Sequence, residues 1–297
     1  GKEKPLSYLG AWRRLRRSYS LDQFDLIHAQ FGQSGLLAMP TRKPLIVTFH
    51  GSDLQGFLSP NGNYSYFSRY LLRISQFVAK RADQAIIVSD HLRDYLPPEI
   101  SPEIIPCGVD LELFRPIPQT EARKRLSLPL DKSLVLFAAD PKRTVKRFQL
   151  AEKSVQLVKS RLDVELIVIS GIPHDEVPLY MNACDALILT SHHEGSPTVV
   201  KEALACNLPI VSVDVGDVRE RIVGIEGCLL CYDDSPEAIA DRIAHVLEAS
   251  TRVPGREAVA DLDERINAQK IISVYRQVLR NRQIAFHPAD ISSKTVS

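Results

Sequence analysis

Short runs of apolar residues alternate with amphipathic segments along most of this chain. The runs are rich in Val, Ile and Leu at consecutive positions, which is typical of parallel strands covered by helices on both faces. The segments between them repeat apolar residues at helical spacing. We predict strands within residues 25–31, 44–50, 84–89, 103–107, 133–139, 165–170, 186–191, 209–214 and 228–232.

Helices are predicted between these strands and at the start of the chain. Alternation of strand and helix is typical of doubly wound α/β domains, and this is the fold class that we expect. The predicted helices lie at residues 5–21, 68–82, 121–128, 146–160, 197–206, 235–250 and 263–281.

The alternation breaks once, at a charged and proline-rich interval over residues 114–132. Pro116 and Pro118 stiffen the chain there, and Pro129 ends the short helix between them and the next strand. The interval divides the chain into a first domain (1–115), a second domain (116–283) and a polar tail (284–297).

The first domain begins with a helix. A doubly wound domain usually opens on its central strand followed by a glycine-rich turn, and neither is found. We therefore expect this domain to be incomplete at its start, either by truncation or because it is naturally reduced.

Composition adds limits but no function. A chain of 297 residues suits one or two domains, and 44% apolar with 25% charged residues is ordinary for a soluble protein. The formal net charge of +1 gives no argument for nucleic acid. No apolar stretch approaches the roughly 20 residues of a membrane span, and no secretory signal opens the chain. We expect a cytoplasmic protein.

Five cysteines, an odd number scattered along the chain, indicate reduced thiols. Cys228 and Cys231 form a C-x-x-C pair, but no second pair accompanies them, so zinc binding is disfavoured. We interpret both as strand residues.

The segment SHHEGSPTVVKEALA, residues 191–205, is the richest in chemistry. Glu194 follows a predicted strand at its carboxyl end, where open α/β sheets bind ligands. Ser196 is suited to a helix N-cap and Pro197 to the first turn, so backbone N–H groups would offer an anion site. Glu202 stands one turn deeper on the helix.

Two carboxylates beside an anion site suit a nucleotide-sugar, because its diphosphate needs N–H donors and its vicinal hydroxyls need acceptors. The alternative is structural. Glu194 would then be a solvated loop residue, and Glu202 a surface residue that pairs with Lys201 or with solvent.

The same segment, extended to EGSPTVVKEALACNLPIVSVDVGDVRERI, resembles the donor site of glycosyltransferase family 4, which has the two-domain GT-B fold. Glu194 and Glu202 fill its Glu-x7-Glu motif. EIIPCGVDLELFRP resembles the hinge entry of the family, with Cys107 in place of Asn. DLIHAQFGQSGLLA, PLIVTFHGSDL and DEVPLYMNACDALILTSHHEGSP follow the family's order along the chain. The resemblance implies two Rossmann-like domains facing a cleft, the first on the acceptor side and the second on the donor side.

The resemblance also implies roles for the residues of this segment. Glu202 would hold the ribose hydroxyls of the nucleotide, and Glu194 would contact the donated sugar. The backbone that would line the sugar and the phosphates belongs to Gly195, Ser196, Pro197 and Thr198.

In the family, a basic pair after the first strand of the second domain neutralises the leaving diphosphate. Its usual Gly-Arg is Ala139-Asp140 here. Arg143 and Lys146 are therefore the best candidates, with Lys142 and Arg147 as runners-up. Their structural alternative is a solvated helix start.

Candidates in the first domain come from the two strand ends that resemble the family. His50 would contact the sugar near the reacting carbon, and Gly51 would allow close approach of the ligand. His28 is either a cleft residue or a satisfied core histidine. Asp53 and Ser89 are further candidates for acceptor contacts.

Taken together, the resemblance implies a retaining, metal-independent hexosyltransferase that needs no cofactor and uses a UDP-type or GDP-type sugar. His192 and His193 lack a third ligand at metal spacing, which agrees with this. The acceptor stays open among a glycan, a lipid-linked molecule and a small molecule. A non-catalytic nucleotide-sugar-binding or accessory protein is the alternative, followed by an epimerase or a phosphorylase-like enzyme.

The opening helix carries Arg13, Arg14, Arg16 and Arg17 beside leucines and Trp12. Basic amphipathic helices can lie on anionic membranes, so a peripheral membrane contact is one interpretation. The other, which we prefer, is a surface helix that packs its apolar side on the sheet.

Overall fold

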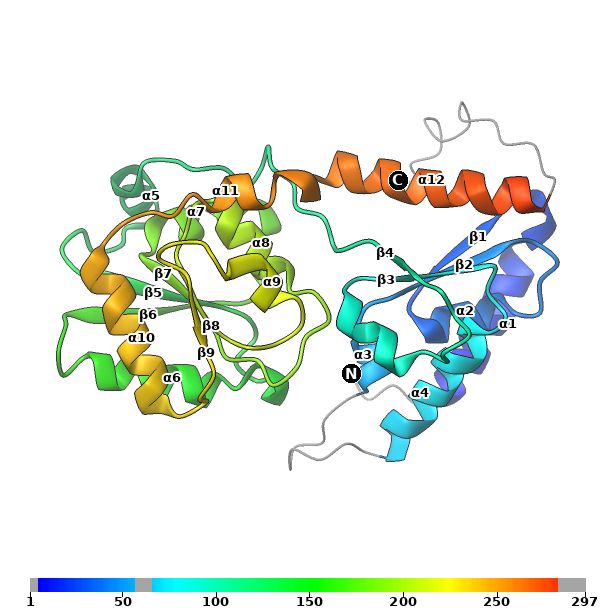
Figure 1. Ribbon diagram of the computed structural model, residues 1–297, viewed down its shortest axis with the longest axis horizontal. Helices are drawn as coiled ribbons and strands as arrows, with labels where there is room; N and C mark the ends of the chain where they lie inside the picture. The colour runs from blue at the N-terminus through cyan, green and yellow to red at the C-terminus, as the bar shows by residue number, and fades with distance from the viewer. Residues whose placement is uncertain (1–4, 57–65, 283–297) are drawn as a thin grey trace. The chain divides into compact units, whose positions relative to one another are not determined.

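The structure is a computed structural model that describes residues 5–56 and 66–282 (Figure 1). Its described residues divide into two compact units, which we call unit 1 (residues 5–56, 66–105 and 268–282) and unit 2 (residues 106–267). Each contains a parallel β-sheet with helices on both faces, which confirms the predicted fold class.

The division differs from the expected one at both ends of the second domain. Unit 1 ends at residue 105 rather than 115, and the chain returns to it from residue 268. The reason for the return lies in helix α12 (Glu264–Asn281), whose Val274 and Val278 are buried against the unit 1 sheet. The tail at 284–297 lies outside the described residues.

Unit 1 has a four-stranded sheet in the order β1-β2-β3-β4, with every pair parallel. Helix α12 covers one face, and α2 and α4 cover the other (Figure 1). The strands are β1 (Ile27–Gln30), β2 (Leu45–Phe49), β3 (Gln84–Ile87) and β4 (Glu103–Ile104), and the other helices of the unit are α1 (Pro5–Ser18), α2 (Gly32–Ala38), α3 (Ser52–Gln55) and α4 (Tyr66–Ala79).

The basic opening helix, α1, is tied to the body of unit 1. Trp12 Nε1 donates to the Met39 carbonyl at 3.0 Å, and the Arg16 guanidinium donates to the carbonyls of Ala38 and Pro40. Arg13, Arg14 and Arg17 of the helix are exposed. These contacts support the interpretation of a surface helix, and membrane contact stays untested. No helix in the described part of the chain has the length and apolar character needed to cross a membrane.

Unit 2 has a five-stranded parallel sheet in the order β6-β5-β7-β8-β9. Helices α6 and α10 cover one face, and α7, α8 and α9 cover the other, with a buried apolar layer under each group (Figure 1). The strands are β5 (Ser133–Ala138), β6 (Val164–Ile169), β7 (Ala186–Leu189), β8 (Ile210–Val213) and β9 (Leu229–Cys231), and the helices are α5 (Gln119–Leu126), α6 (Phe148–Val158), α7 (Val177–Ala183), α8 (Thr198–Ala205), α9 (Val218–Ile222), α10 (Pro236–Ala249) and α11 (Gly255–Ala258).

The strand order places a switch point between β5 and β7. From β5 the chain moves outward to β6 on one side, and then returns to build β7, β8 and β9 on the other. The connections that leave the carboxyl ends of β5 and β7 therefore diverge, and open α/β sheets bind ligands in the crevice formed there.

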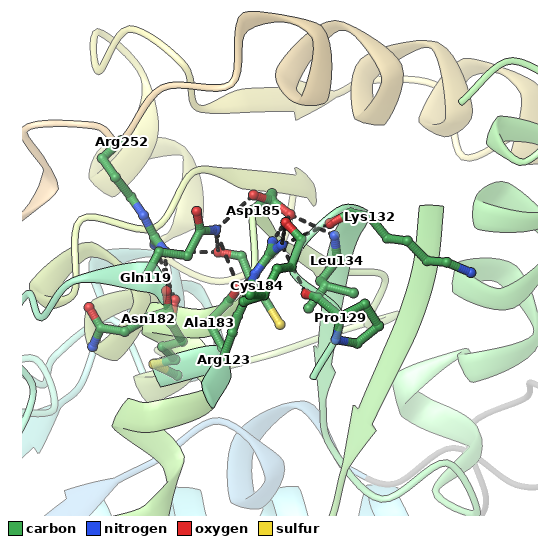
Figure 2. Close-up of polar contacts among 12 residues, drawn as sticks. Gln119, Arg123, Pro129, Lys132, Leu134, Asn182, Ala183, Cys184, Asp185 and Arg252 are labelled. Carbon is green, nitrogen blue, oxygen red and sulfur yellow. Dashed lines mark hydrogen bonds and ion pairs between the residues drawn. The ribbon is translucent and has the colours of Figure 1, made fainter. Parts of the chain in front are cut away.

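A buried ion pair fixes the opposite end of these two strands. Asp185, just before β7, accepts hydrogen bonds from Arg123 Nη2 at 2.7 Å and from the backbone N–H of Leu134 in β5 at 2.6 Å. Figure 2 shows the Arg123 guanidinium converging with Gln119 on the residues that lead from α7 into β7.

Both partners of this pair use nearly all of their hydrogen-bonding capacity. Arg123 is only 5% exposed and also donates to four backbone carbonyl oxygens. These belong to Pro129, Leu130, Lys132 and Ala183. A buried ion pair that is fully hydrogen-bonded keeps one geometry, because any displacement leaves a charge unpaired.

We expect Arg123→Met to lower the free energy of unfolding of unit 2 by about 3–5 kcal/mol, because Asp185 would stay buried without its cation. Urea unfolding followed by circular dichroism measures the loss. Trp12, the single tryptophan, lies in unit 1, so its fluorescence transition should not move.

The matched control is Arg161→Met, because Arg161 pairs with Asp241 on the surface with 56% and 64% of the two side chains exposed. It should leave both transitions unchanged. Equal effects of the two variants would contradict the structural role of the Arg123–Asp185 pair.

Candidate functional site

At the carboxyl ends of β5 and β7, two loops are joined by an ion pair. Lys146 Nζ lies 2.5 Å from Glu194 Oε1, with 14% and 16% of the two side chains exposed. Lys146 ends a single turn after β5, and Glu194 stands in the loop after β7. The switch point therefore brings together a cation and a carboxylate that the sequence separates by 48 positions.

Backbone bonds hold the two loops in this register. Thr190 Oγ1 donates to the Lys146 carbonyl at 2.9 Å, and the His192 N–H donates to the Val145 carbonyl at 2.8 Å. Arg147 has a left-handed backbone (φ 48°), and its Nε donates to the Thr190 carbonyl at 2.5 Å. Arg147 also pairs with Asp234, so it fastens the loops together.

The other two basic candidates point elsewhere. Lys142 and Arg143 are exposed, in a turn in which the Arg143 N–H donates to the Asp140 carbonyl at 3.1 Å. Of the four basic residues considered from the sequence, Lys146 alone is paired with a motif carboxylate within the described residues. Arg143 stays a candidate that a ligand would have to recruit.

The loop from Gly195 to Pro197 leads into α8, whose first residue is Thr198. The N-cap is Pro197, which offers no side-chain bond, so the predicted capping by Ser196 is wrong. The Ser196 hydroxyl instead donates to Asp217 Oδ2 at 2.7 Å, because a buried lysine and aspartate lie directly beneath the loop.

That lysine is Lys201, with 0% of its side chain exposed. Its Nζ hydrogen-bonds to Ser196 Oγ and lies 3.4 Å from Asp217 Oδ2, and Arg221 Nε also approaches this carboxylate, at 3.4 Å. Burial lowers the pKa of Lys201, and the nearby Asp217 opposes the shift. Asp217 Oδ1 is buried without a hydrogen-bond partner among the described residues.

A glycine completes this support. Gly216 has φ +58°, and a Cβ there would lie 2.9 Å from the Gly195 carbonyl oxygen. The loop of the donor motif therefore rests on a glycine backbone and on a buried ion pair. From the sequence, Lys201 was considered only as a surface partner of Glu202 in the structural alternative, although helical periodicity puts it on the same face as the apolar Leu204 and Ala205.

Glu202, the second motif carboxylate, has 13% of its side chain exposed, and His174 Nε2 lies 3.1 Å from its Oε1. Burial raises the pKa of Glu202, and His174 acts against the shift. The His174 ring also packs on Phe114, with ring centroids 5.1 Å apart. The sequence reasoning missed His174, although its position just after β6, at the same edge of the sheet, was a usable signal.

In unit 1, His50 and Gly51 stand at the carboxyl end of β2, as expected. Gly51 has φ 107°, a conformation that suits only glycine. Asp53 is 1% exposed, and its carboxylate accepts the backbone N–H groups of His50, Gly51 and Gly32. Asp53 is thus committed to holding two loops together, rather than exposed toward an acceptor.

The other unit 1 candidates also have internal partners. His28 lies 2.7 Å from both the Tyr275 hydroxyl and the Thr48 hydroxyl. Burial, with a smaller contribution from His50, lowers the pKa of His28 from 6.5 to about 4. Ser89 is buried and lies 2.9 Å from His91 Nδ1.

His192, His193 and the cysteines give no metal site. Over residues 5–56 and 66–282, no group of three or more His, Cys, Asp or Glu side chains is arranged to hold a metal ion. All five cysteines are free. Cys231 lies in β9 as predicted, whereas the buried Cys228 immediately precedes that strand.

Two family models match this chain. Residues 1–113 match the family described as Glycosyltransferase Family 4, and residues 149–268 match Glycosyl transferases group 1. TuaC of Bacillus subtilis, named for teichuronic acid biosynthesis, is 30% identical over 268 residues, covering 82% of this chain and 66% of TuaC. A D-inositol 3-phosphate glycosyltransferase of Thermobispora bispora is 25% identical over 300 residues, covering 86% of this chain and 69% of the relative.

The chain thus spans about two thirds of the length of these relatives. Among solved structures, sucrose-phosphate synthase from Thermosynechococcus elongatus has a TM-score of 0.76 at 21% identity, covering 92% of this chain and 78% of that one. Anabaena Alr3699/HepE in complex with UDP and glucose has a TM-score of 0.70 at 19% identity, covering 92% and 83%. These neighbours show that the fold is GT-B.

The low pKa of His28 predicts a pH dependence of stability. Between about pH 4 and pH 6.5 the folded protein binds fewer protons at His28 than the unfolded chain, so unit 1 should lose stability as the pH falls through this range. The full shift corresponds to about 3 kcal/mol, and we expect less because the ring is only partly buried.

Urea unfolding of unit 1, followed by Trp12 fluorescence at several pH values, measures this dependence. His28→Gln should flatten it, whereas His245→Gln, a change on the exposed side of α10 in unit 2, should not. An unchanged slope in His28→Gln would contradict the assignment.

Removing the charge of Lys201, which lies buried beneath the loop Gly195–Pro197, should destabilise unit 2. Lys201→Met should cost about 3 kcal/mol of unfolding free energy, because Asp217 would stay buried and undercompensated. Adding Asp217→Asn should restore part of the loss. Circular dichroism during urea unfolding provides the measurement, with the exposed Lys153→Met as control. Equal stability of Lys201→Met and the parent would mean that the pair does not support the loop.

Proposed function

The chain belongs to the glycosyltransferase family 4 type of GT-B proteins, and we propose that it is a retaining glycosyltransferase that uses a nucleoside-diphosphate sugar. The observation that carries the proposal is the Lys146–Glu194 pair at the switch point. The loop that contains Glu194 leads into the N-terminus of α8, and Glu202 lies one turn further along this helix. Each of the three features suits a different part of one ligand.

The diphosphate would bind at the N-terminus of α8 and at Lys146. The first N–H groups of a helix have no partner within it, and the helix dipole adds positive potential there. When the sugar leaves, negative charge grows on the diphosphate, and a cation already in place stabilises that charge without reorganising. We propose that Lys146 supplies this charge, with Arg143 as a second cation that bound donor would draw in.

The donated sugar would meet Glu194. In the free protein Glu194 neutralises Lys146, so neither charge is buried alone. A bound diphosphate would share Lys146, and the Glu194 carboxylate could then accept hydrogen bonds from sugar hydroxyls. Glu194 therefore balances the charge of Lys146 until the donor binds.

The ribose would bind at Glu202, whose carboxylate accepts from His174 at 3.1 Å in the free protein. A carboxylate has lone pairs for further donors, so vicinal hydroxyls can join or replace the histidine. The Glu202 carboxylate is largely buried, so leaving it without a hydrogen-bond partner costs free energy.

His50 and Gly51 in unit 1 would contact the sugar and the acceptor side. The relatives are named for teichuronic acid biosynthesis and for inositol 3-phosphate, so we propose a hydroxyl acceptor in glycan or glycolipid biosynthesis. The Anabaena neighbour was solved with UDP and glucose, which favours UDP as the nucleotide to test first.

The experiment is calorimetric titration of the chain with UDP, GDP and ADP. We expect micromolar binding of one nucleotide and at least a 30-fold loss in Glu202→Ala, because the ribose loses its acceptor, equivalent to about 2 kcal/mol. Glu220→Ala, a change at an exposed position of α9, is the control and should bind as the parent does.

If the chain binds a nucleotide and also turns over the matching nucleotide-sugar, with release of the nucleotide, the result would support an enzyme. Binding without any turnover would favour an accessory nucleotide-sugar-binding protein. If none of the three nucleotides binds, the proposed donor site is wrong.

A further inference from the structure

A chain of polar side chains links His50 to the last helix of unit 1. His50 Nε2 lies 2.7 Å from Gln30 Oε1, and Gln30 Nε2 lies 3.3 Å from His28 Nε2. His28 in turn contacts Thr48 through Nε2 and Tyr275 of α12 through Nδ1, each at 2.7 Å. Residues from β1, β2 and α12 thus meet in one network, all within unit 1.

The chemistry of the amide gives this network a direction. An amide oxygen only accepts, so His50 must carry a proton on Nε2 to bond Gln30. An amide nitrogen only donates, so His28 Nε2 must accept, and the His28 proton lies on Nδ1 and is donated to the Tyr275 hydroxyl. The Thr48 hydroxyl, at 2.7 Å, donates to the same His28 nitrogen and shares its single lone pair with the longer Gln30 contact at 3.3 Å.

The backbone around Gln30 and His50 is fixed independently. Phe31 has φ 74°, unusual for a residue with a side chain, and its ring packs on the His50 ring with centroids 4.6 Å apart. The Phe31 N–H donates to the Thr48 carbonyl at 2.8 Å. A Cβ at Gly32 would lie 2.3 Å from Ser75 Oγ, so the backbone there approaches Ser75 too closely for any larger residue.

Strained backbone persists only where the surroundings determine it, and it concentrates at functional sites. Here the strain places an aromatic ring on one side of His50 and Gln30 at its Nε2. Asp53 holds the backbone N–H of His50 from the other side, at 3.0 Å. The imidazole is therefore oriented by three elements at once.

We propose that Gln30 is a positioning residue for His50, which it holds as the tautomer protonated on Nε2, and that His28, Thr48 and Tyr275 hold Gln30 in the orientation this requires. The proposal rests on the proposed function only for the role of His50 toward the sugar. The position of α12 and the orientation of His50 are then coupled, because Tyr275 is the end of the network.

The titratable groups bonded to this network or to the His50 backbone are His28 of β1, Asp53 of α3 and Tyr275 of α12. Burial lowers the pKa of both His28 and His50 and raises the pKa of Tyr275 and of Asp53. A neutral network agrees with these directions. A carboxylate in place of the Gln30 amide would reverse the balance at His50.

The test is nuclear magnetic resonance of histidine side chains labelled with nitrogen-15, in the parent and in Gln30→Glu. In the parent we expect His50 as the Nε2-protonated tautomer and His28 as the Nδ1-protonated one. Gln30→Glu should raise the pKa of His50 by about one unit or more, because a carboxylate within hydrogen-bond distance favours imidazolium. Gln30→Met should give a mixture of His50 tautomers.

Gln55→Glu is the matched control, because it makes the same change of an amide that contacts a histidine in the same unit: Gln55 Nε2 lies 3.2 Å from His91 Nε2. It should change the resonances of His91 and leave those of His50 as in the parent. Tyr275→Phe should change the His28 resonances more than those of His50, because Tyr275 contacts His28 directly. It should also make the two tautomers of His50 more equally populated.

An unchanged tautomer and pKa of His50 in both Gln30 variants would overturn the proposal. A shifted His50 pKa should also give Gln30→Glu a pH profile in which kcat falls as the pH drops through that pKa, with KM nearly constant. If the resonances change as expected but turnover does not, the positioning holds and the role of His50 in the proposed function is wrong.

Discussion

The two ends of the β5–β7 pair are the constraint on which the rest of unit 2 depends. At the amino end, Asp185 joins the backbone of β5 to Arg123 and keeps the two strands in register. At the carboxyl end, Glu194 joins Lys146. Both acidic residues belong to segments that flank β7, and both basic residues belong to segments that flank β5, so the same strand pair is held by charge at each end.

The two ion pairs differ in what they allow. Arg123 is almost fully buried and bonded to four carbonyl oxygens besides Asp185, so no ligand can replace its partner. Lys146 and Glu194 are partly exposed, and each has one ionic partner among the described residues. A diphosphate that bound there would compete with Glu194 for the cation. Rigidity at one end of the strands and exchangeable charge at the other is what a preorganised site requires.

The sequence was sufficient for most of the fold because buried parallel strands appear as apolar runs. All nine predicted strands form, and Glu194 lies in the loop that follows the carboxyl end of β7, as predicted. It was insufficient wherever a side chain's partner is distant along the chain. The burial of Lys201 depends on Asp217, which the sequence does not show to be its partner. The pairing of Arg123 with Asp185 spans 62 positions.

The periodicity of a helix also does not show on which sheet the helix packs. The apolar face of α12 was clear, but sequence order alone assigned the helix to the second domain, whereas it belongs mainly to unit 1.

The two units use different electrostatics for what we propose to be one reaction. The candidate residues of unit 2 are charged and paired, which suits a ligand that carries a diphosphate. In unit 1, His28 and His50 belong to a network of neutral amide, hydroxyl and imidazole groups, in which the direction of each hydrogen bond is set by its neighbour. A neutral imidazole can face a sugar without adding charge near the reacting carbon, where a fixed cation would oppose the positive charge that develops there. Partial burial of His28 and His50 keeps the two imidazoles neutral, since imidazolium would lose solvation in those positions.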